Sequence, residues 1–181
     1  MSDVEIPRRT DKAASDELFM EEALRAAQRA LETGEVPVGA VVVCDGKIVG
    51  RGSNRNLADS DPTSHAEIVA LREAGAALGN HRLEGCELFA TIEPCAMCAG
   101  ALVHARLKRL VYGADDAKAG AIRSVMQVLN HPSLNHRMAV RSGVLAGHCA
   151  ELLQSFFRQR REEKSSVVSP QSSATGDSPD D

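Results

Sequence analysis

Two short motifs, 30 residues apart, place the strongest constraint on what this 181-residue chain can fold into. The first is His65-Ala66-Glu67, and the second is Pro94-Cys95-Ala96-Met97-Cys98. One imidazole and two thiolates suit Zn²⁺, and three protein ligands leave the fourth tetrahedral position open for water, as in catalytic sites. A fold that uses these residues together must bring the two motifs to one point.

Each residue of the two motifs also has a simpler explanation when it is taken alone. Cys95 and Cys98 could form a thioredoxin-type dithiol, and His65 could be a buried or capping histidine. The tetrapeptide that starts at Ser64 matches a capping box, in which Glu67 reaches back to the start of its helix. The dithiol explanation leaves His65 and Glu67 without a role, whereas the long pattern His-x-Glu…Pro-Cys-x-x-Cys gives every residue one. We therefore predict that His65, Cys95 and Cys98 hold zinc and that Glu67 is the catalytic proton carrier.

The hydrophobic pattern predicts an α/β fold with a mixed sheet. Apolar residues recur at helical spacing between Leu18 and Leu31, and Gly34 ends that helix. Asp45-Gly46 separates two β-rich runs, which predicts an antiparallel hairpin. The predicted order is a hairpin of strands at 40–44 and 47–52, helix 65–78, strand 87–92, helix 95–104, strand 109–113, a weaker strand at 139–141, and a last helix with an apolar stripe from Leu152 to Phe157. Alternating strands and helices give a partly parallel sheet covered on both faces.

This pattern places both motifs at helix starts. We expect Pro94 to be the first helical residue, which puts the two cysteines in the opening turns of their helix. His65 opens its own helix. The positive ends of the two helix dipoles favour thiolate over thiol, and helix starts of this kind follow the carboxyl ends of strands, where ligands bind in such sheets.

Composition points to a cytoplasmic location and a three-part chain. The net charge is -4, with the basic residues concentrated in 108–164 and acidic residues prevailing elsewhere. We find no apolar run of the ~20 residues needed to span a bilayer and no secretion signal at the N-terminus. We expect a flexible extension at 1–15, one folded domain at 16–164 and a disordered acidic tail at 165–181. Of the five cysteines, Cys44, Cys86 and Cys149 are expected to be inert thiols.

Longer motifs extend around the two short ones. From about residue 16 to 164 the chain resembles the bacterial tRNA-specific adenosine deaminases, members of the zinc-dependent cytidine and deoxycytidylate deaminase superfamily. The superfamily motifs are the segments 35–40, 61–67 and 93–101, and those typical of the tRNA enzymes are 112–121, 130–136 and 156–161. Two residues depart from the pattern: Asp115 stands where a basic residue is expected, and Ala119 where a hydroxyl is expected.

The resemblance implies a fold, a reaction and a set of partners. The fold is a three-layer α/β/α cytidine-deaminase-like arrangement with a mixed, mostly five-stranded sheet. The reaction is hydrolytic deamination of adenosine to inosine at the wobble position (34) of the anticodon of tRNA-Arg, by a homodimer with one Zn²⁺ per chain and no organic cofactor. The resemblance also implies that Asn54 binds the base, that Val36 and His65 flank it, and that Asp116 and Phe157 lie near neighbouring nucleotides.

Two alternatives of different classes remain open. A zinc deaminase of a free base or nucleoside, such as cytidine or guanine, would use the same ligands but ignore tRNA. A non-catalytic zinc or RNA-binding protein would tolerate loss of Glu67. The basic segment 108–164 agrees with RNA binding, but aromatic residues are only 3% of the chain and tryptophan is absent, so a large stacking platform is not expected. Recognition of an extruded base and of the loop backbone is the more suitable mode.

Overall fold

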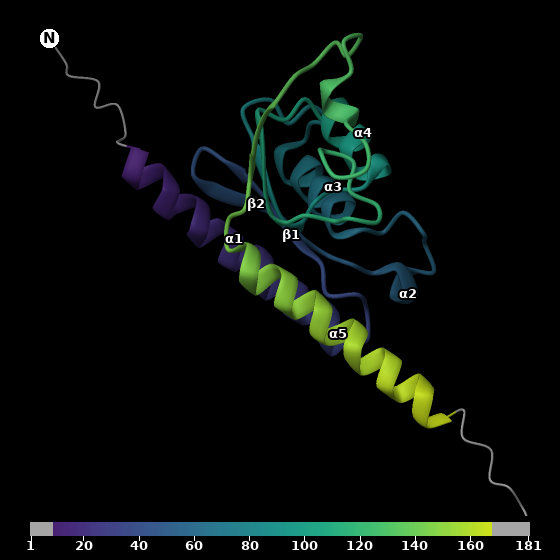
Figure 1. Ribbon diagram of the computed structural model, residues 1–181. Helices are drawn as coiled ribbons and strands as arrows, with labels where there is room; N and C mark the ends of the chain where they lie inside the picture. Colours follow the sequence, from purple (N-terminus) through teal and green to yellow (C-terminus); the bar gives the residue numbers. More distant parts are fainter. Residues whose placement is uncertain (1–8, 168–181) are drawn as a thin grey trace, which may run out of the picture.

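A five-stranded sheet in the order β2-β1-β3-β4-β5 is the centre of the computed structural model, which describes residues 9–167 (Figure 1). The strands are β1 (Gly39–Cys44), β2 (Lys47–Ser53), β3 (Glu87–Ile92), β4 (Arg109–Ala114) and β5 (Ala139–Ser142). β1 pairs antiparallel with β2 and β3, whereas β3, β4 and β5 run parallel to one another. The predicted mixed sheet and its opening hairpin are confirmed.

Helices cover both faces of the sheet, which gives the three predicted layers. The helices α1 (Arg9–Glu32) and α5 (Ala146–Val167) lie on one face, and α3 (Ala66–Leu78) and α4 (Ala96–His104) on the other (Figure 1). Successive side chains of a strand point to opposite faces. Val41 and Phe89 therefore pack with the α1 side, while Val42 and Leu88 pack with the α3 side.

The helix α3 lies unusually close to β2. A Cβ atom on Gly52 would lie 2.0 Å from the carbonyl oxygen of Ala66, so only glycine permits this backbone-to-backbone approach. On the helix side, the residues that face the sheet are the alanines Ala66, Ala70 and Ala74, all with no exposed surface. Small residues on both elements thus fix the start of α3 against the sheet.

Several boundaries differ from the sequence prediction. The first helix begins at Arg9, so residues 9–15 are helical rather than part of a flexible extension, and α5 continues past 164 to Val167. The remainder of the expected extension and tail, residues 1–8 and 168–181, lies outside the described residues. None of the described helices is both long and apolar enough to cross a membrane.

Two short helices were not predicted. These are α2 (Asn56–Asp59) and the 3₁₀ turn η1 (Val128–Asn130). The backbone N–H groups of Leu57 and Ala58 in α2 donate to the carboxylate of Glu35, at 2.8 and 2.9 Å. The partner is more than twenty residues away, so local sequence carried no signal for this turn.

A buried ion network ties α1 to three strands. Arg109 on β4 donates to the carboxylate of Asp16 on α1, with one contact at 2.9 Å, and to Glu87 on β3 at 2.6 Å. Arg141 on β5 pairs with the same aspartate. The side chains of Arg109 and Asp16 are only 9% and 2% exposed. Removing one member leaves an uncompensated charge inside the protein.

We predict that Arg109→Met lowers the free energy of unfolding by about 3–5 kcal/mol, because Asp16 and Glu87 lose their shared cation in a buried setting. Urea denaturation followed by circular dichroism measures this. Arg25→Met is the matched control, since Arg25 pairs with Glu21 and Glu22 on the exposed face of α1 and exposed pairs contribute little. Equal midpoints for the two variants would contradict the prediction.

Candidate metal centre and active site

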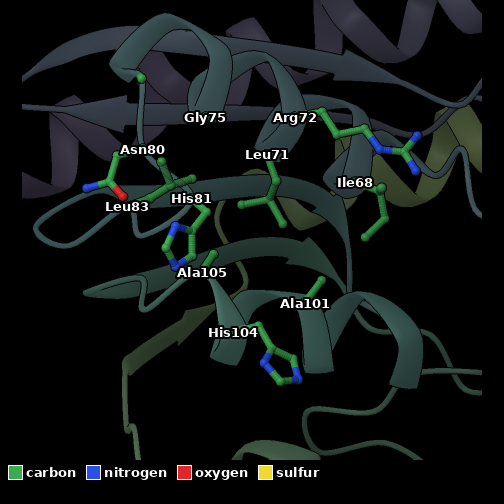
Figure 2. Close-up of a pocket in the computed structure, with 11 residues that line it drawn as sticks. Ile68, Leu71, Arg72, Gly75, Asn80, His81, Leu83, Ala101, His104 and Ala105 are labelled. Atoms are coloured by element: carbon green, nitrogen blue, oxygen red, sulfur yellow. The ribbon is translucent and has the colours of Figure 1, made fainter.

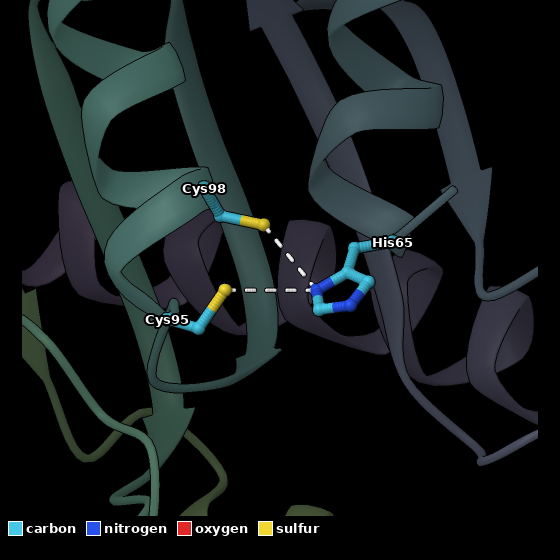
Figure 3. Close-up of side chains that lie close together, drawn as sticks. All are labelled: His65, Cys95 and Cys98. Carbon is cyan, nitrogen blue, oxygen red and sulfur yellow. Dashed lines mark hydrogen bonds between the residues drawn. The ribbon is translucent and has the colours of Figure 1, made fainter. Parts of the chain in front are cut away.

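The three predicted zinc ligands lie together although they come from two helices. The Nδ1 atom of His65 is 3.7 Å from the sulfur of Cys95 and 3.6 Å from that of Cys98 (Figure 3). All three donor atoms lie within 4.8 Å of one another, and no other such group was found in residues 9–167. Donors that share one tetrahedral Zn²⁺ at ordinary bond lengths are about 3.5 Å apart. The donor set and its spacing therefore fit zinc.

The two helix starts set these positions. His65 is the N-cap of α3 and Cys95 the N-cap of α4, both with extended backbone and no side-chain capping bond. We predicted Pro94 as the first helical residue, and this is wrong: Pro94 precedes the N-cap residue Cys95. The reason is that Cys95 forms an antiparallel bridge with Gly120, which holds it extended. Both helix N-termini still face the cluster, and their dipoles favour the anionic sulfur.

The two thiols share protons unequally. Hydrogen bonds from Cys98 and His65 lower the pKa of Cys95 to about 3. The hydrogen bond to Cys95, together with burial, raises the pKa of Cys98. The sulfur of Cys95 in turn raises the pKa of His65. One thiolate is thus ready for a metal, and binding of a dication displaces the proton on Cys98.

Glu67 lies in the first turn of α3, beside the cluster, and is 3% exposed. Burial raises the pKa of its carboxyl. The capping-box explanation of this residue is wrong, because Ser64 is not the helix cap. The Ser64 hydroxyl donates instead to Asp59 and Asp61, at 3.1 Å each. The local pattern failed because acidic residues at the end of α2 and just after it compete for that hydroxyl.

Asn54 supplies the missing cap from a distance. Its side-chain oxygen accepts a hydrogen bond from the backbone N–H of Ala66, the first residue of α3, at 2.9 Å. The residue is 9% exposed. Since the oxygen is engaged, the NH₂ group of Asn54 is left to donate toward a ligand.

A cavity of about 820 Å³ joins these residues to the surface. His65, Glu67 and Cys95 line it, together with a loop after β4 and the middle of α5. The four residues expected to contact substrate all line it as well: Val36, Asn54, Asp116 and Phe157. The structure thus brings every predicted site residue to one cavity except Cys98, which lies buried behind it.

Residues 14–161 match the family described as MafB19-like deaminase. The chain belongs to this deaminase family. The tRNA-specific adenosine deaminase of Haemophilus influenzae is 50% identical over 150 residues, which cover 82% of this chain and 87% of that protein. The enzyme of the same name from Bacillus subtilis is 45% identical over 149 residues, which cover 82% and 92%.

Solved structures agree with this assignment. A structure from studies of A-to-I editing by tRNA:A34 deaminases superimposes with a TM-score of 0.73 at 46% identity, covering 75% of this chain and 99% of that one. A guanine deaminase from Nitrosomonas europaea reaches a TM-score of 0.67 at 24% identity, over 86% and 96% of the chains, and shares the fold. Zinc is the cofactor of cytidine-deaminase-like enzymes, and the imidazole and two sulfurs of the deaminase fit it.

The arginines in the second half of α5 do not all face the cavity. Arg158 and Arg161 line the cavity of the deaminase. Arg160 turns away: it donates to the carbonyl oxygen of Gly34 at 3.0 Å, and its guanidinium lies 5.3 Å from the ring centre of Phe156. Helical spacing carries the signal, because residues 158 and 161 are three apart and share a face.

The loop after β4 also differs from the expectation. Asp115, which stands in place of a basic residue, pairs with Arg123 at 3.0 and 2.7 Å. Lys118, also on this loop, is a lining residue that the motifs did not single out. A second missed residue is Glu93, which is 1% exposed. The available signal was its place at the end of a buried strand, where a carboxylate must find donors.

We expect purified protein to carry about one zinc per chain, and Cys98→Ala to lose most of it, because two ligands bind the ion far less tightly than three. Elemental analysis by mass spectrometry measures the content. Cys44→Ala is the control, since Cys44 ends β1 and is not in the ligand cluster. Full zinc content in Cys98→Ala would remove this residue from the ligand set.

Proposed function

We propose that this deaminase converts adenosine to inosine at the wobble position (34) of the anticodon of tRNA-Arg. The observation that carries the proposal is the cavity, which joins the ligand cluster and Glu67 to a wall that holds Lys118, Arg158 and Arg161. Basic side chains at such a mouth suit the phosphates of an RNA loop. Relatives named tRNA-specific adenosine deaminase support the same substrate.

The reaction consumes one water and releases ammonia. Bound to His65, Cys95 and Cys98, Zn²⁺ would act as a Lewis acid that makes water nucleophilic near neutral pH. Glu67 takes a proton from the attacking water and passes it to N1 of adenine as the oxygen adds to C6. Glu67 then carries the second proton to the amine, the bond from C6 to that nitrogen breaks, and ammonia leaves. No organic cofactor takes part in this balance.

The other lining residues orient the nucleotide. Asn54 donates its free NH₂ group to a ring nitrogen, and Val36 and His65 pack against the faces of the base. Phe157, a residue that is 43% exposed, contacts a neighbouring base by stacking. Asp116 accepts the backbone N–H groups of Lys118 and Ala119, at 2.9 and 3.1 Å, and so shapes the loop beside the next nucleotide.

We also propose that the enzyme is a homodimer acting in the cytoplasm on the anticodon stem-loop. A groove of about 740 Å³ between α3 and α4 supports the dimer (Figure 2). Its apolar side chains include Ile68, Leu71 and Ala101, and burying such a surface favours association. Light scattering of the purified protein tests this, with the mass of two chains as the expected result.

We predict that Glu67→Gln keeps fold and zinc but slows inosine formation in an anticodon stem-loop by at least ~10², because an amide cannot carry protons. Inosine is quantified by mass spectrometry of digested RNA. Free adenosine, cytidine and guanine are assayed in parallel with the wild-type enzyme. Turnover of a free compound as efficient as that of the stem-loop would favour the free-base deaminase. Near-normal activity of Glu67→Gln would remove the catalytic role.

A second prediction concerns the two arginines at the cavity mouth. Arg158→Gln with Arg161→Gln should weaken stem-loop binding and reduce the slope of log K against log[salt] by roughly 0.7 for each lost phosphate contact. Fluorescence anisotropy at several salt concentrations gives both values. Arg160→Gln is the matched control from the same helix, and its affinity and slope should stay at the wild-type values because its side chain contacts Gly34 and Phe156. If Arg160→Gln changed the affinity and the slope as much as the Arg158/Arg161 double variant does, Arg158 and Arg161 would not be the RNA contacts.

A further inference from the structure

Glu93 binds both ends of one loop with a single carboxylate. The residue follows β3 and is 1% exposed. One oxygen accepts the backbone N–H groups of Ile122, Arg123 and Ser124, at 3.0, 2.7 and 3.0 Å. The other accepts the N–H of Asp116 at 3.1 Å and the hydroxyl of Ser124. Segment 115–124, here called the substrate loop, is therefore closed onto this side chain.

The backbone around Glu93 makes the same connection. Its own N–H donates to the carbonyl of Ala114 at 2.8 Å, and the N–H of Ala121 donates to the carbonyl of Pro94 at 2.9 Å. Gly120 lies where a Cβ atom would be 2.3 Å from the Glu93 carboxylate. The substrate loop thus packs directly on the residues that lead to the metal ligand Cys95.

No ion pair accounts for the burial of this carboxylate. Within residues 9–167, Glu93 has no partner among the ion pairs. Four backbone N–H groups and one hydroxyl satisfy it instead, which is the pattern of an anion held in a nest of amides. A buried charge is costly to keep, and here its hydrogen bonds are spent on one loop that lines the cavity.

We propose that Glu93 is a positioning residue that fixes the substrate loop relative to the metal-ligand segment. The loop contributes residues 115–119 to the cavity wall. Because the loop is already ordered before binding, less conformational entropy is lost when RNA binds. The inference rests on the proposed function in that the ligand of this wall is RNA. The connection between Glu93 and the loop does not depend on that ligand.

The test compares local exchange with kinetics in Glu93→Gln. The side-chain amide of glutamine has one acceptor oxygen in place of two, and its NH₂ group would face backbone N–H groups that need an acceptor. We expect amide hydrogens of Asp116, Ile122, Arg123 and Ser124 to exchange at least ~10-fold faster, while those of β3 and β4 are unchanged. KM for the stem-loop should rise by a similar factor, with kcat changed less and zinc content retained.

An independent variant separates loop placement from the loss of the carboxylate. Gly120→Ala forces the loop away from Glu93 and should give the same exchange pattern and the same rise in KM. Gly147→Ala is the matched control, because a Cβ there meets nothing within 4 Å. Should Glu93→Gln fail to fold, Gly120→Ala and the milder Ser124→Ala, which removes one hydroxyl donor, carry the test.

Two results would overturn the proposal. One is unchanged exchange at the four amides in both Glu93→Gln and Gly120→Ala. The other is faster exchange throughout the sheet together with equal losses in kcat and KM, which would make Glu93 a general stability residue. Absence of stem-loop turnover by the wild-type enzyme would count against the proposed function alone, since hydrogen exchange reads the loop without substrate.

Discussion

Backbone contact between α3 and β2 is the interaction on which the site depends. Gly52 and the alanines of α3 remove side-chain bulk from this interface, so the helix rests on the sheet at a distance that no larger residue would permit. His65 and Glu67 belong to the first turn of that helix and inherit its position. A metal site tolerates shifts of a few tenths of an ångström, and dense packing is the means by which a fold supplies such accuracy.

The loops around the cavity are fixed by a second device, the buried acceptor. Glu35, Asn54 and Glu93 each accept backbone N–H groups from segments distant in sequence. Each thereby satisfies donors at an irregular piece of chain that would otherwise face water. The cavity wall is thus built from loops whose conformations are set by side chains of the core, which suits a site that must be open and ordered at once.

These devices explain which features the sequence could reveal. The strands and long helices follow hydrophobic periodicity, and the ligand residues follow a spacing that few other structures need. A capping box of Ser64 and Glu67 also satisfied the local rules. In the structure the Ser64 hydroxyl donates to Asp59 and Asp61, and Asn54 accepts the first N–H group of α3 instead. The short helix α2 was missed for a different reason, because its acceptor Glu35 lies 22 residues away in the chain. Local patterns thus fail both where nearby side chains compete for one donor and where folding brings a partner from a distant segment.

The buried ion network carries a consequence for synthesis of the chain. Asp16 is made early, but its partners Arg109 and Arg141 lie 93 and 125 residues further on. On a ribosome, the hairpin β1–β2 can pair as soon as it emerges, whereas this aspartate stays solvated until most of the domain has been translated. The part of α1 that carries Asp16 therefore reaches its final contacts late, whereas Met20 and Ala23 of the same helix pack on the early strand β1; contacts of such sequence separation slow folding.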